Sequence, residues 1–275
     1  MGCSYQKIGM FEVNRLYLTV SLMLLFSVIT AVWGKESGFL KRRLSVGGEE
    51  FIYQVYVPPE WEADLKWPVI LFLHGAGERG SDGEEQTREG LGPSIQKNPN
   101  RFPAIVVMPQ CRRGVWWNDR QMEELVLESL DQSIQEFNGD SDRIYLTGLS
   151  MGGYGTFYFG ARYPGKFAAL VPICGGVVPP RELRGADAES FRSRYIETAE
   201  KIGKTPVWIF HGSDDHRVSV SESRSMLEAL KMAGVVVDYT EYEGVGHNSW
   251  DRAYSEPELL PWMLSKSRSP VIGNR

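Results

Sequence analysis

One serine of this sequence stands among glycines in the stretch GLSMGGYG, residues 148–155. The apolar run 144–147 precedes it, and a helical pattern begins near Gly152, directly after Ser150. A sharp strand-to-helix turn presents a serine hydroxyl to a substrate, and glycines there keep a Cβ atom from colliding with neighbouring backbone. The spacing Gly-x-Ser-x-Gly therefore predicts a nucleophilic Ser150, with a simple helix N-cap as the alternative role.

A serine hydroxyl attacks a carbonyl only when a base removes its proton, and histidine does this near neutral pH. The chain has four histidines. In open α/β sheets the order along the chain is nucleophile, acid, histidine, which excludes His74 because it precedes Ser150. His211 is expected to brace the turn after its strand, and His216 lies too close to the neighbouring aspartates. His247, in the small-residue loop EGVGHNSW, is the predicted base.

The base in turn needs a carboxylate that orients its ring. Asp214 and Asp215 compete for this role, because both follow the strand-like run 207–210 in the stretch HGSDDHRV. The residues alone leave the choice open. The aspartate that does not act as the acid is expected to be a turn residue that hydrogen-bonds the local backbone.

Hydrolysis also needs donors for the negative oxygen that develops on the attacked carbonyl. One is expected to be the backbone N–H of Met151, the residue after the nucleophile. The second is expected in the loop His74-Gly75-Ala76-Gly77, where small residues let backbone donors come close. Ala76 is the predicted second donor, and Gly77 is the alternative.

Two tryptophans are candidates for substrate contact. Trp116 and Trp117 lie in the stretch GVWWND, after the strand-like run 104–108. Tryptophan presents a broad flat face, so the pair is predicted either to form an apolar or sugar-stacking wall or to pack in the core. The long loop 75–92 lies on the same side of the sheet, and its Glu78-Arg79 pair is expected to order it, with substrate contact as the alternative.

Short apolar runs alternate with helical patterns after residue 35, which is typical of an α/β domain with a mostly parallel sheet. The predicted helices are residues 121–137, 152–162, 192–202, 221–232 and 257–267. The predicted strands are residues 39–46, 51–57, 67–75, 104–108, 144–147, 168–173, 207–210 and 235–242. No repeat or linker divides this part, so residues 35–275 are predicted to form a single catalytic domain.

The composition excludes some classes of partner. The 275 residues are 42% hydrophobic and 24% charged, as in an ordinary globular protein. The formal net charge of −5 leaves no basic footprint for nucleic acid, whose binding needs clustered Lys and Arg. No nucleic acid partner is therefore expected.

The first 34 residues differ in composition from the rest of the chain. An uncharged apolar run, residues 16–33, comes after Lys7 and Arg15, as in a secretory signal peptide with a small-residue cleavage site. Its 18 residues are also close to the length of a membrane-spanning helix. Residues 1–34 are predicted to be a signal peptide of an exported, periplasmic or secreted protein, or else an uncleaved membrane anchor.

Cys111 and Cys174 each follow a strand-like run. Strands that are not neighbours hold such positions too far apart for a disulfide. Both are expected to be reduced and partly buried thiols.

Four stretches in order, HGAGERGSDG, GLSMGGYGTF, HGSDDHRV and GHNSWDRAY, resemble the α/β-hydrolase superfamily. The resemblance is closest to small exported esterases related to feruloyl esterases, polyhydroxybutyrate depolymerases, dienelactone hydrolases and the prolyl oligopeptidase catalytic domain. It implies a mostly parallel eight-stranded sheet flanked by helices, no cofactor and no metal. It also places the acid on Asp215. The chain has no room for the large gating domain of the peptidases, so no large lid domain is expected, and residues 177–204 can supply only a short cap.

The predicted function is a serine hydrolase that forms an acyl-enzyme on Ser150 and cleaves carboxylic esters, either short-chain esters or acyl esters of carbohydrate. A serine peptidase or lysophospholipase-type hydrolase on the same triad is the alternative. A catalytically silent carbohydrate-binding relative is the alternative from another class. A small-molecule or carbohydrate ester is the expected partner, with a membrane contacted only through an uncleaved N-terminal segment.

Overall fold

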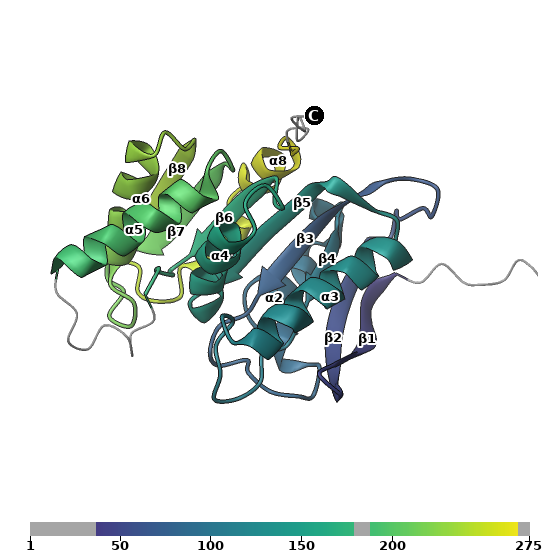
Figure 1. Ribbon diagram of the computed structural model, residues 1–275. Coiled ribbons are helices and arrows are strands. Elements are labelled where there is room, and N and C mark those ends of the chain that lie inside the picture. The colour runs from purple at the N-terminus through teal and green to yellow at the C-terminus, as the bar shows by residue number, and fades with distance from the viewer. Residues whose placement is uncertain (1–36, 179–187, 269–275) are drawn as a thin grey trace, which may run out of the picture. The chain divides into compact units, whose positions relative to one another are not determined.

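The computed structural model describes residues 37–178 and 188–268, except for the side chains of residues 188–191. An eight-stranded sheet forms its centre (Figure 1). The strand order is β1-β2-β4-β3-β5-β6-β7-β8. Strands β1 and β2 pair antiparallel, as do β2 and β4, and every other pair is parallel. The mostly parallel sheet is therefore confirmed. The strands are β1 (Gly38–Val46), β2 (Glu49–Val57), β3 (Trp67–Leu73), β4 (Ile105–Met108), β5 (Gly139–Leu149), β6 (Ala169–Ile173), β7 (Val207–Gly212) and β8 (Val237–Tyr242).

Helices cover both faces of this sheet, as predicted. Those packed in the core of one face are α3, α4, α5 and α6, which lie in front of the sheet in Figure 1. The core of the other face contains residues of α2, α7 and α8. The helices are α2 (Leu91–Lys97), α3 (Arg120–Glu136), α4 (Met151–Arg162), α5 (Ala188–Ile202), α6 (Val220–Met232), α7 (Trp250–Ser255) and α8 (Leu259–Leu264), with the 3₁₀ turns η1 (Glu85–Thr87) and η2 (Pro99–Arg101).

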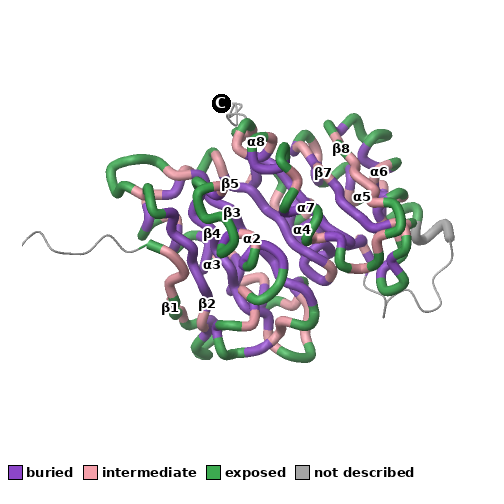
Figure 2. The backbone as a smooth tube through the Cα atoms, turned by 180° about the vertical axis from the view of Figure 1, so that it is seen from behind, coloured by how far each residue is buried: buried purple, intermediate pink, exposed green. Residues whose placement is uncertain are grey.

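The central strands are buried on both sides because each supplies both cores. In β3, Val69 and Leu71 belong to one core and Ile70 and Phe72 to the other. This results from the two-residue period of a strand, and it explains why such strands read as continuous apolar runs. Figure 2 shows the buried positions concentrated along these strands, with exposed ones in the loops and on the outer sides of the helices.

Several elements differ from the sequence prediction, most clearly α2, α7 and β5. Helices α2 and α7 were not expected, because seven and six residues are too short to show a helical period. Strand β5 begins at Gly139, five residues before the apolar run. The prediction missed this first part because it contains the polar sequence Asp140-Ser141-Asp142. The hairpin between β1 and β2 turns at Gly47 and Gly48 as predicted, both with positive φ.

The parallel topology brings the candidate residues to one edge of the sheet. Ser150 follows β5, His74 follows β3 and Asp215 lies just after β7, in each case at the carboxyl end of the strand. His247 lies in the loop after β8. In open α/β sheets this edge is where ligands bind.

No large additional domain is inserted in residues 37–178 or 188–268. The predicted signal peptide or anchor lies outside the described residues, and so do residues 179–187 of the predicted cap. Within the described part of the chain, none of the helices combines the length and apolarity needed to cross a membrane.

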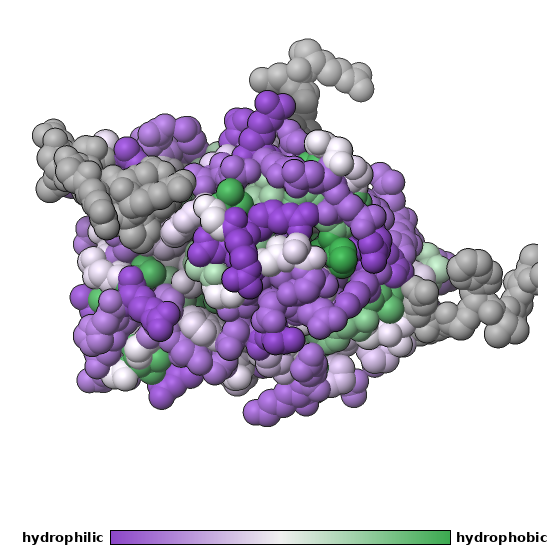
Figure 3. All heavy atoms as spheres, turned by 90° about the horizontal axis from the view of Figure 1, so that it is seen from below, coloured by the Kyte–Doolittle hydropathy of each residue, from purple (hydrophilic) through white to green (hydrophobic). Residues whose placement is uncertain are grey.

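The surface carries few large apolar side chains. Those exposed among the described residues are Leu65, Met232 and Val236. The face drawn in Figure 3 is mainly hydrophilic, with hydrophobic residues visible in small separate patches.

Candidate active site

Ser150 occupies a strained turn between β5 and α4. Its backbone has φ 53° and ψ −117°, outside the regions that residues with a Cβ normally adopt. The Ser150 N–H donates to the carbonyl oxygen of Ile173 at 2.9 Å. Its side chain makes no capping hydrogen bond to α4, so the alternative role as an N-cap is not seen. The hydroxyl is directed instead to His247.

The glycines of the motif let the backbone at the end of β3 approach this turn. A Cβ on Gly148 would lie 2.7 Å from the carbonyl oxygen of Leu73. One on Gly152 would overlap that oxygen and lie 2.9 Å from the carbonyl oxygen of His74. The end of β3 and the start of α4 therefore meet backbone to backbone, as the spacing of the motif predicts.

His247 connects the serine to a carboxylate. Its Nε2 lies 2.9 Å from Ser150 Oγ, and its Nδ1 lies 2.7 Å from Asp215 Oδ2. Nδ1–H donates to the carboxylate, which leaves Nε2 free to accept the serine proton. The His247 side chain is 15% exposed, and the edge of Trp250 packs against its ring. The imidazole therefore has both a fixed orientation and access from the solvent side.

Asp215, rather than Asp214, is the buried carboxylate. The backbone N–H groups of Arg217 and Val218 donate to its Oδ1 at 2.8 and 2.9 Å. Burial opposes ionisation, but the hydrogen bonds from His211, His247 and these N–H groups outweigh it and hold the pKa of Asp215 far below its usual range. Asp214 is exposed and accepts a hydrogen bond from the hydroxyl of Ser213 at 2.9 Å, a side chain instead of the backbone group that the sequence predicted.

His211 braces the turn, as the sequence suggested. It is fully buried, and its Nε2 lies 3.0 Å from the Val218 carbonyl oxygen and 3.2 Å from Asp215 Oδ2. Because both of these groups are acceptors, Nε2 carries the hydrogen and Nδ1 accepts from Ser223 Oγ at 2.6 Å. Asp215 Oδ2 therefore accepts hydrogen bonds from both His211 and His247.

The candidate oxyanion donors come from two different elements. Met151 is the first residue of α4, and N–H groups in the first turn of a helix have no partner within the helix. Ala76 is exposed in the loop after β3. The preceding residue, Gly75, places this loop beside the nucleophile, since a Cβ on Gly75 would lie 3.6 Å from Ser150 Cβ.

His74, which the sequence excluded as a base, anchors this loop. Its ring is fully buried, with Nδ1–H donating to the Gly75 carbonyl oxygen at 2.6 Å and Nε2 accepting from the Cys111 N–H at 3.0 Å. Burial lowers the pKa of His74 to about 4, so the ring is neutral at physiological pH. A local sequence pattern could not show this role, because Cys111 lies in the loop of another strand.

Gln110 is a second residue whose role the sequence did not reveal. Its side chain accepts from the Gly83 N–H at 2.8 Å and donates to the Glu78 carbonyl oxygen at 3.2 Å. Arg79 orders the same loop from its other side, donating to the carbonyl oxygens of Ala76 and Val115. The long loop 75–92 is thus fixed by side chains within it and from the loop after β4.

Trp117 packs in the core, which is one of the two roles predicted for it. Only 1% of its surface is exposed, its indole N–H donates to the His74 carbonyl oxygen at 3.0 Å, and its ring packs in the core. A buried ring has no face to offer a sugar. Trp116 is partly exposed and packs edge-on against Tyr154, with ring centroids 5.7 Å apart. Trp116 and Tyr154 line a small hollow of about 30 Å³ that also reaches Met151.

Both described cysteines are free and buried. Cys174 lies under the triad, where its sulfur and ligand atoms of Asp215 and His247 are all within 4.8 Å of one another. Burial raises the pKa of the Cys174 thiol to about 12, and a thiol binds a metal ion as the thiolate. The close Asp215–His247 hydrogen bond further disfavours a metal ion at this position.

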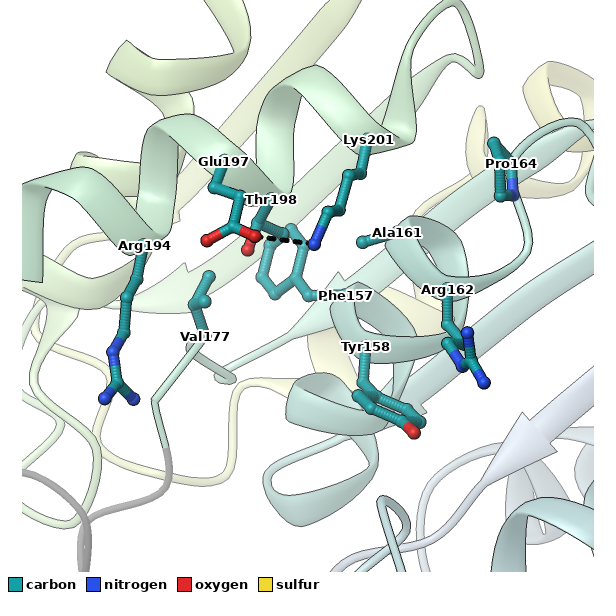
Figure 4. Close-up of a pocket in the computed structure, with 10 residues that line it drawn as sticks. All are labelled: Phe157, Tyr158, Ala161, Arg162, Pro164, Val177, Arg194, Glu197, Thr198 and Lys201. Carbon is teal, nitrogen blue, oxygen red and sulfur yellow. Dashed lines mark hydrogen bonds and ion pairs between the residues drawn. The ribbon is translucent and has the colours of Figure 1, made fainter. Parts of the chain in front are cut away.

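A larger hollow of about 610 Å³ lies between α4 and α5 and contains none of the triad residues (Figure 4). Its polar side chains include Arg162, Arg194, Glu197 and Lys201, and Lys201 pairs with Glu197 at 2.6 Å. It is an open surface groove. The chemistry-bearing groups gather instead at the carboxyl edge of the sheet.

Comparison with known proteins points to hydrolases. The chain is 28% identical over 200 residues to carboxylesterase SOBER1 of Arabidopsis thaliana, an alignment that covers 65% of this chain and 82% of the relative. It is 24% identical over 193 residues to an acetyl esterase of Caldicellulosiruptor saccharolyticus, which covers 58% of this chain and 71% of the relative.

Solved structures show the same fold. A thermostable esterase superimposes with a TM-score of 0.71 at 33% identity, over 84% of this chain. The chain spans only 63% of the length of that esterase. A ferulic acid esterase superimposes with a TM-score of 0.64 at 20% identity, over 83% of this chain and 98% of its own, which shows the fold alone.

The model of the Esterase family matches residues 45–257, which include every element from β2 to α7 and all three residues of the candidate triad. The fold, its strand order and the relatives agree with this match. The chain therefore belongs to the Esterase family and is a hydrolase of the α/β-hydrolase superfamily.

Proposed function

We propose that this protein is a serine esterase that forms an acyl-enzyme on Ser150. The observation that carries the proposal is the continuous hydrogen-bonded series from Ser150 Oγ through His247 to Asp215, with separations of 2.9 and 2.7 Å. A nucleophile, a base within reach of its proton and a group that orients the base are the parts that acyl transfer requires.

In the first half of the reaction, Ser150 Oγ bonds to the ester carbonyl carbon while its proton passes to His247 Nε2. The N–H groups of Met151 and Ala76 are proposed to hold the resulting oxyanion. Collapse of this intermediate breaks the bond to the alcohol oxygen, which leaves with the proton from His247. Asp215 stabilises the imidazolium while it carries the proton.

In the second half, a water molecule gives a proton to His247 Nε2 and attacks the acyl carbon. The second intermediate releases the carboxylic acid, and Ser150 Oγ recovers its proton from His247. Every proton therefore moves through one imidazole nitrogen. None of the described residues is dedicated to protonating a poorer leaving group, so esters are preferred to amides as substrates, with peptidase or lysophospholipase-type activity as the alternative.

Short-chain or carbohydrate-linked acyl esters are the proposed substrates. The small hollow beside Trp116 and Met151, about 30 Å³, supports a short acyl group because of its small size. The names of two relatives, a carboxylesterase and an acetyl esterase, are consistent with this class. Export through residues 1–34, or anchoring by residues 16–33, stays a prediction.

A fluorophosphonate probe tests the mechanism because it reacts with an activated serine. The purified wild type is expected to be labelled and to hydrolyse p-nitrophenyl acetate. Ser150→Ala and His247→Ala are expected to lose both properties, while His216→Ala, a matched variant of an exposed histidine, keeps both. A folded wild type that is neither labelled nor active would refute the proposal and favour the silent binding module.

A further inference from the structure

A carboxylate that the proposed mechanism does not use lies beside the nucleophile. Glu78 Oε2 is buried and makes no hydrogen bond within the described part of the chain. It lies 3.0 Å from the position that a Cβ on Gly75 would take, and Ser150 Cβ lies 3.6 Å from the same position. Leu149 Cδ1 lies 2.8 Å from this position as well, so the carboxylate, the nucleophile and an apolar side chain all pack around Gly75.

The cations of the same loop do not neutralise this carboxylate. The Arg79 guanidinium is turned to two carbonyl oxygens, of Ala76 and Val115. Arg88 pairs with Glu85 at 2.7 Å. Both arginines of the loop are therefore engaged with groups other than Glu78.

The surroundings of Glu78 are instead apolar or acidic. Burial raises its pKa, the charges of Glu89 and Glu85 raise it further, and the backbone N–H groups of Gly75 and Glu78 lower it only in part. No cation contributes. A buried carboxylate in such surroundings is costly unless a donor or a positive charge reaches it, and groups of this kind concentrate at ligand sites.

We propose that Glu78 binds a positively charged group of the substrate, so that the enzyme prefers esters that carry an ammonium close to the scissile bond. This rests on the proposed function, because it needs the ester at Ser150. The side chain as a whole is only partly buried, so a substrate bound at Ser150 can approach it from the solvent side. An ammonium fits better than a hydroxyl because it also relieves the repulsion between Glu78 and Glu89.

Two matched pairs of esters test this. Acetylthiocholine and 3,3-dimethylbutyl thioacetate have the same shape but differ by one charge on the alcohol side. The p-nitrophenyl esters of betaine and of 3,3-dimethylbutanoic acid differ in the same way on the acyl side. For at least one pair, the wild type is expected to show a kcat/KM about tenfold or more higher for the cation once the ratio is divided by that of the uncatalysed hydrolysis rates, the effect of one ion pair in surroundings of low dielectric constant.

Glu78→Gln keeps the shape of the side chain and removes its charge, so it is expected to bring that ratio close to one. Glu84→Gln is the matched control, because Glu84 lies in the same loop, is exposed and pairs with Lys41. It should leave the ratio unchanged. Absence of any preference for the cation, or a preference that survives Glu78→Gln, would overturn the inference.

An acetylated methyl xyloside tests the alternative, in which Glu78 accepts hydrogen bonds from the hydroxyl groups of a sugar. If Glu78→Gln slows only this substrate, the carboxylate accepts sugar hydroxyls and the cation assignment is wrong. Hydrolysis of the neutral esters and fluorophosphonate labelling report separately on the proposed function. If both are absent in the wild type, the proposed function and the inference fall together, whereas neutral hydrolysis without a charge preference overturns the inference alone.

Discussion

The backbone strain at Ser150 leads to a quantitative prediction about two variants that are both inactive. With φ 53° and ψ −117°, a residue that has a Cβ pays about 1–3 kcal/mol in conformational energy, and glycine does not. Ser150→Ala and Ser150→Gly lose the same hydrogen bond to His247, so that loss cancels in the comparison. Glycine costs about 0.4–1 kcal/mol through the greater entropy of the unfolded chain. Ser150→Gly is therefore expected to be more stable than Ser150→Ala by about 1 kcal/mol.

Denaturant titration and thermal unfolding of the two variants measure this difference. For a domain of this size, about 1 kcal/mol corresponds to a rise in Tm of about 2–4 °C. Identical m-values are required, so that the comparison concerns the folded state. If Ser150→Gly were equal to or less stable than Ser150→Ala, the turn would not store strain at Ser150, and the geometric account of the nucleophile would be wrong.

Three further predictions concern packing, pH and the acyl group. Gly152→Ala is expected to lower the free energy of unfolding by at least about 3 kcal/mol or to prevent folding, since its Cβ would overlap the Leu73 carbonyl oxygen. Gly77→Ala, which has open space, should change the denaturation midpoint little; equal losses would contradict the steric argument. Burial lowers the pKa of His74 from 6.5 to about 4, so the unfolded chain takes up the proton first as pH falls between these values, and up to about 3 kcal/mol of stability is lost. Urea titrations from pH 7 to pH 4 should show a weaker pH dependence for His74→Gln, and an unchanged dependence would refute the assignment. Trp116→Ala is expected to raise kcat/KM for p-nitrophenyl butyrate relative to acetate several-fold by widening the small hollow, and an unchanged chain-length profile would count against that hollow as the acyl site.

Local pattern was sufficient for the strands of the sheet and for two of the three candidate triad residues. The strands are apolar runs whose burial on both faces leaves a signal in consecutive residues, as in β3. Ser150 and His247 were selected because the turn motif and the chain order are properties of the sequence itself. Choosing Asp215 over its neighbour needed the family resemblance, since two adjacent aspartates look alike until one is buried. Short helices such as α7 left no periodic signal to detect.

The sequence by itself therefore determined which segments form the strands and which residues are available for the chemistry. Only the tertiary structure decided which of them face one another and which are buried. Trp117 and Trp116 are adjacent in the chain, yet one is in the core and the other is partly exposed. His74 acquires a hydrogen-bond partner from Cys111, in a loop that is distant in the sequence. Burial and electrostatic environment are sums over such long-range neighbours, so a local pattern of residues does not contain them.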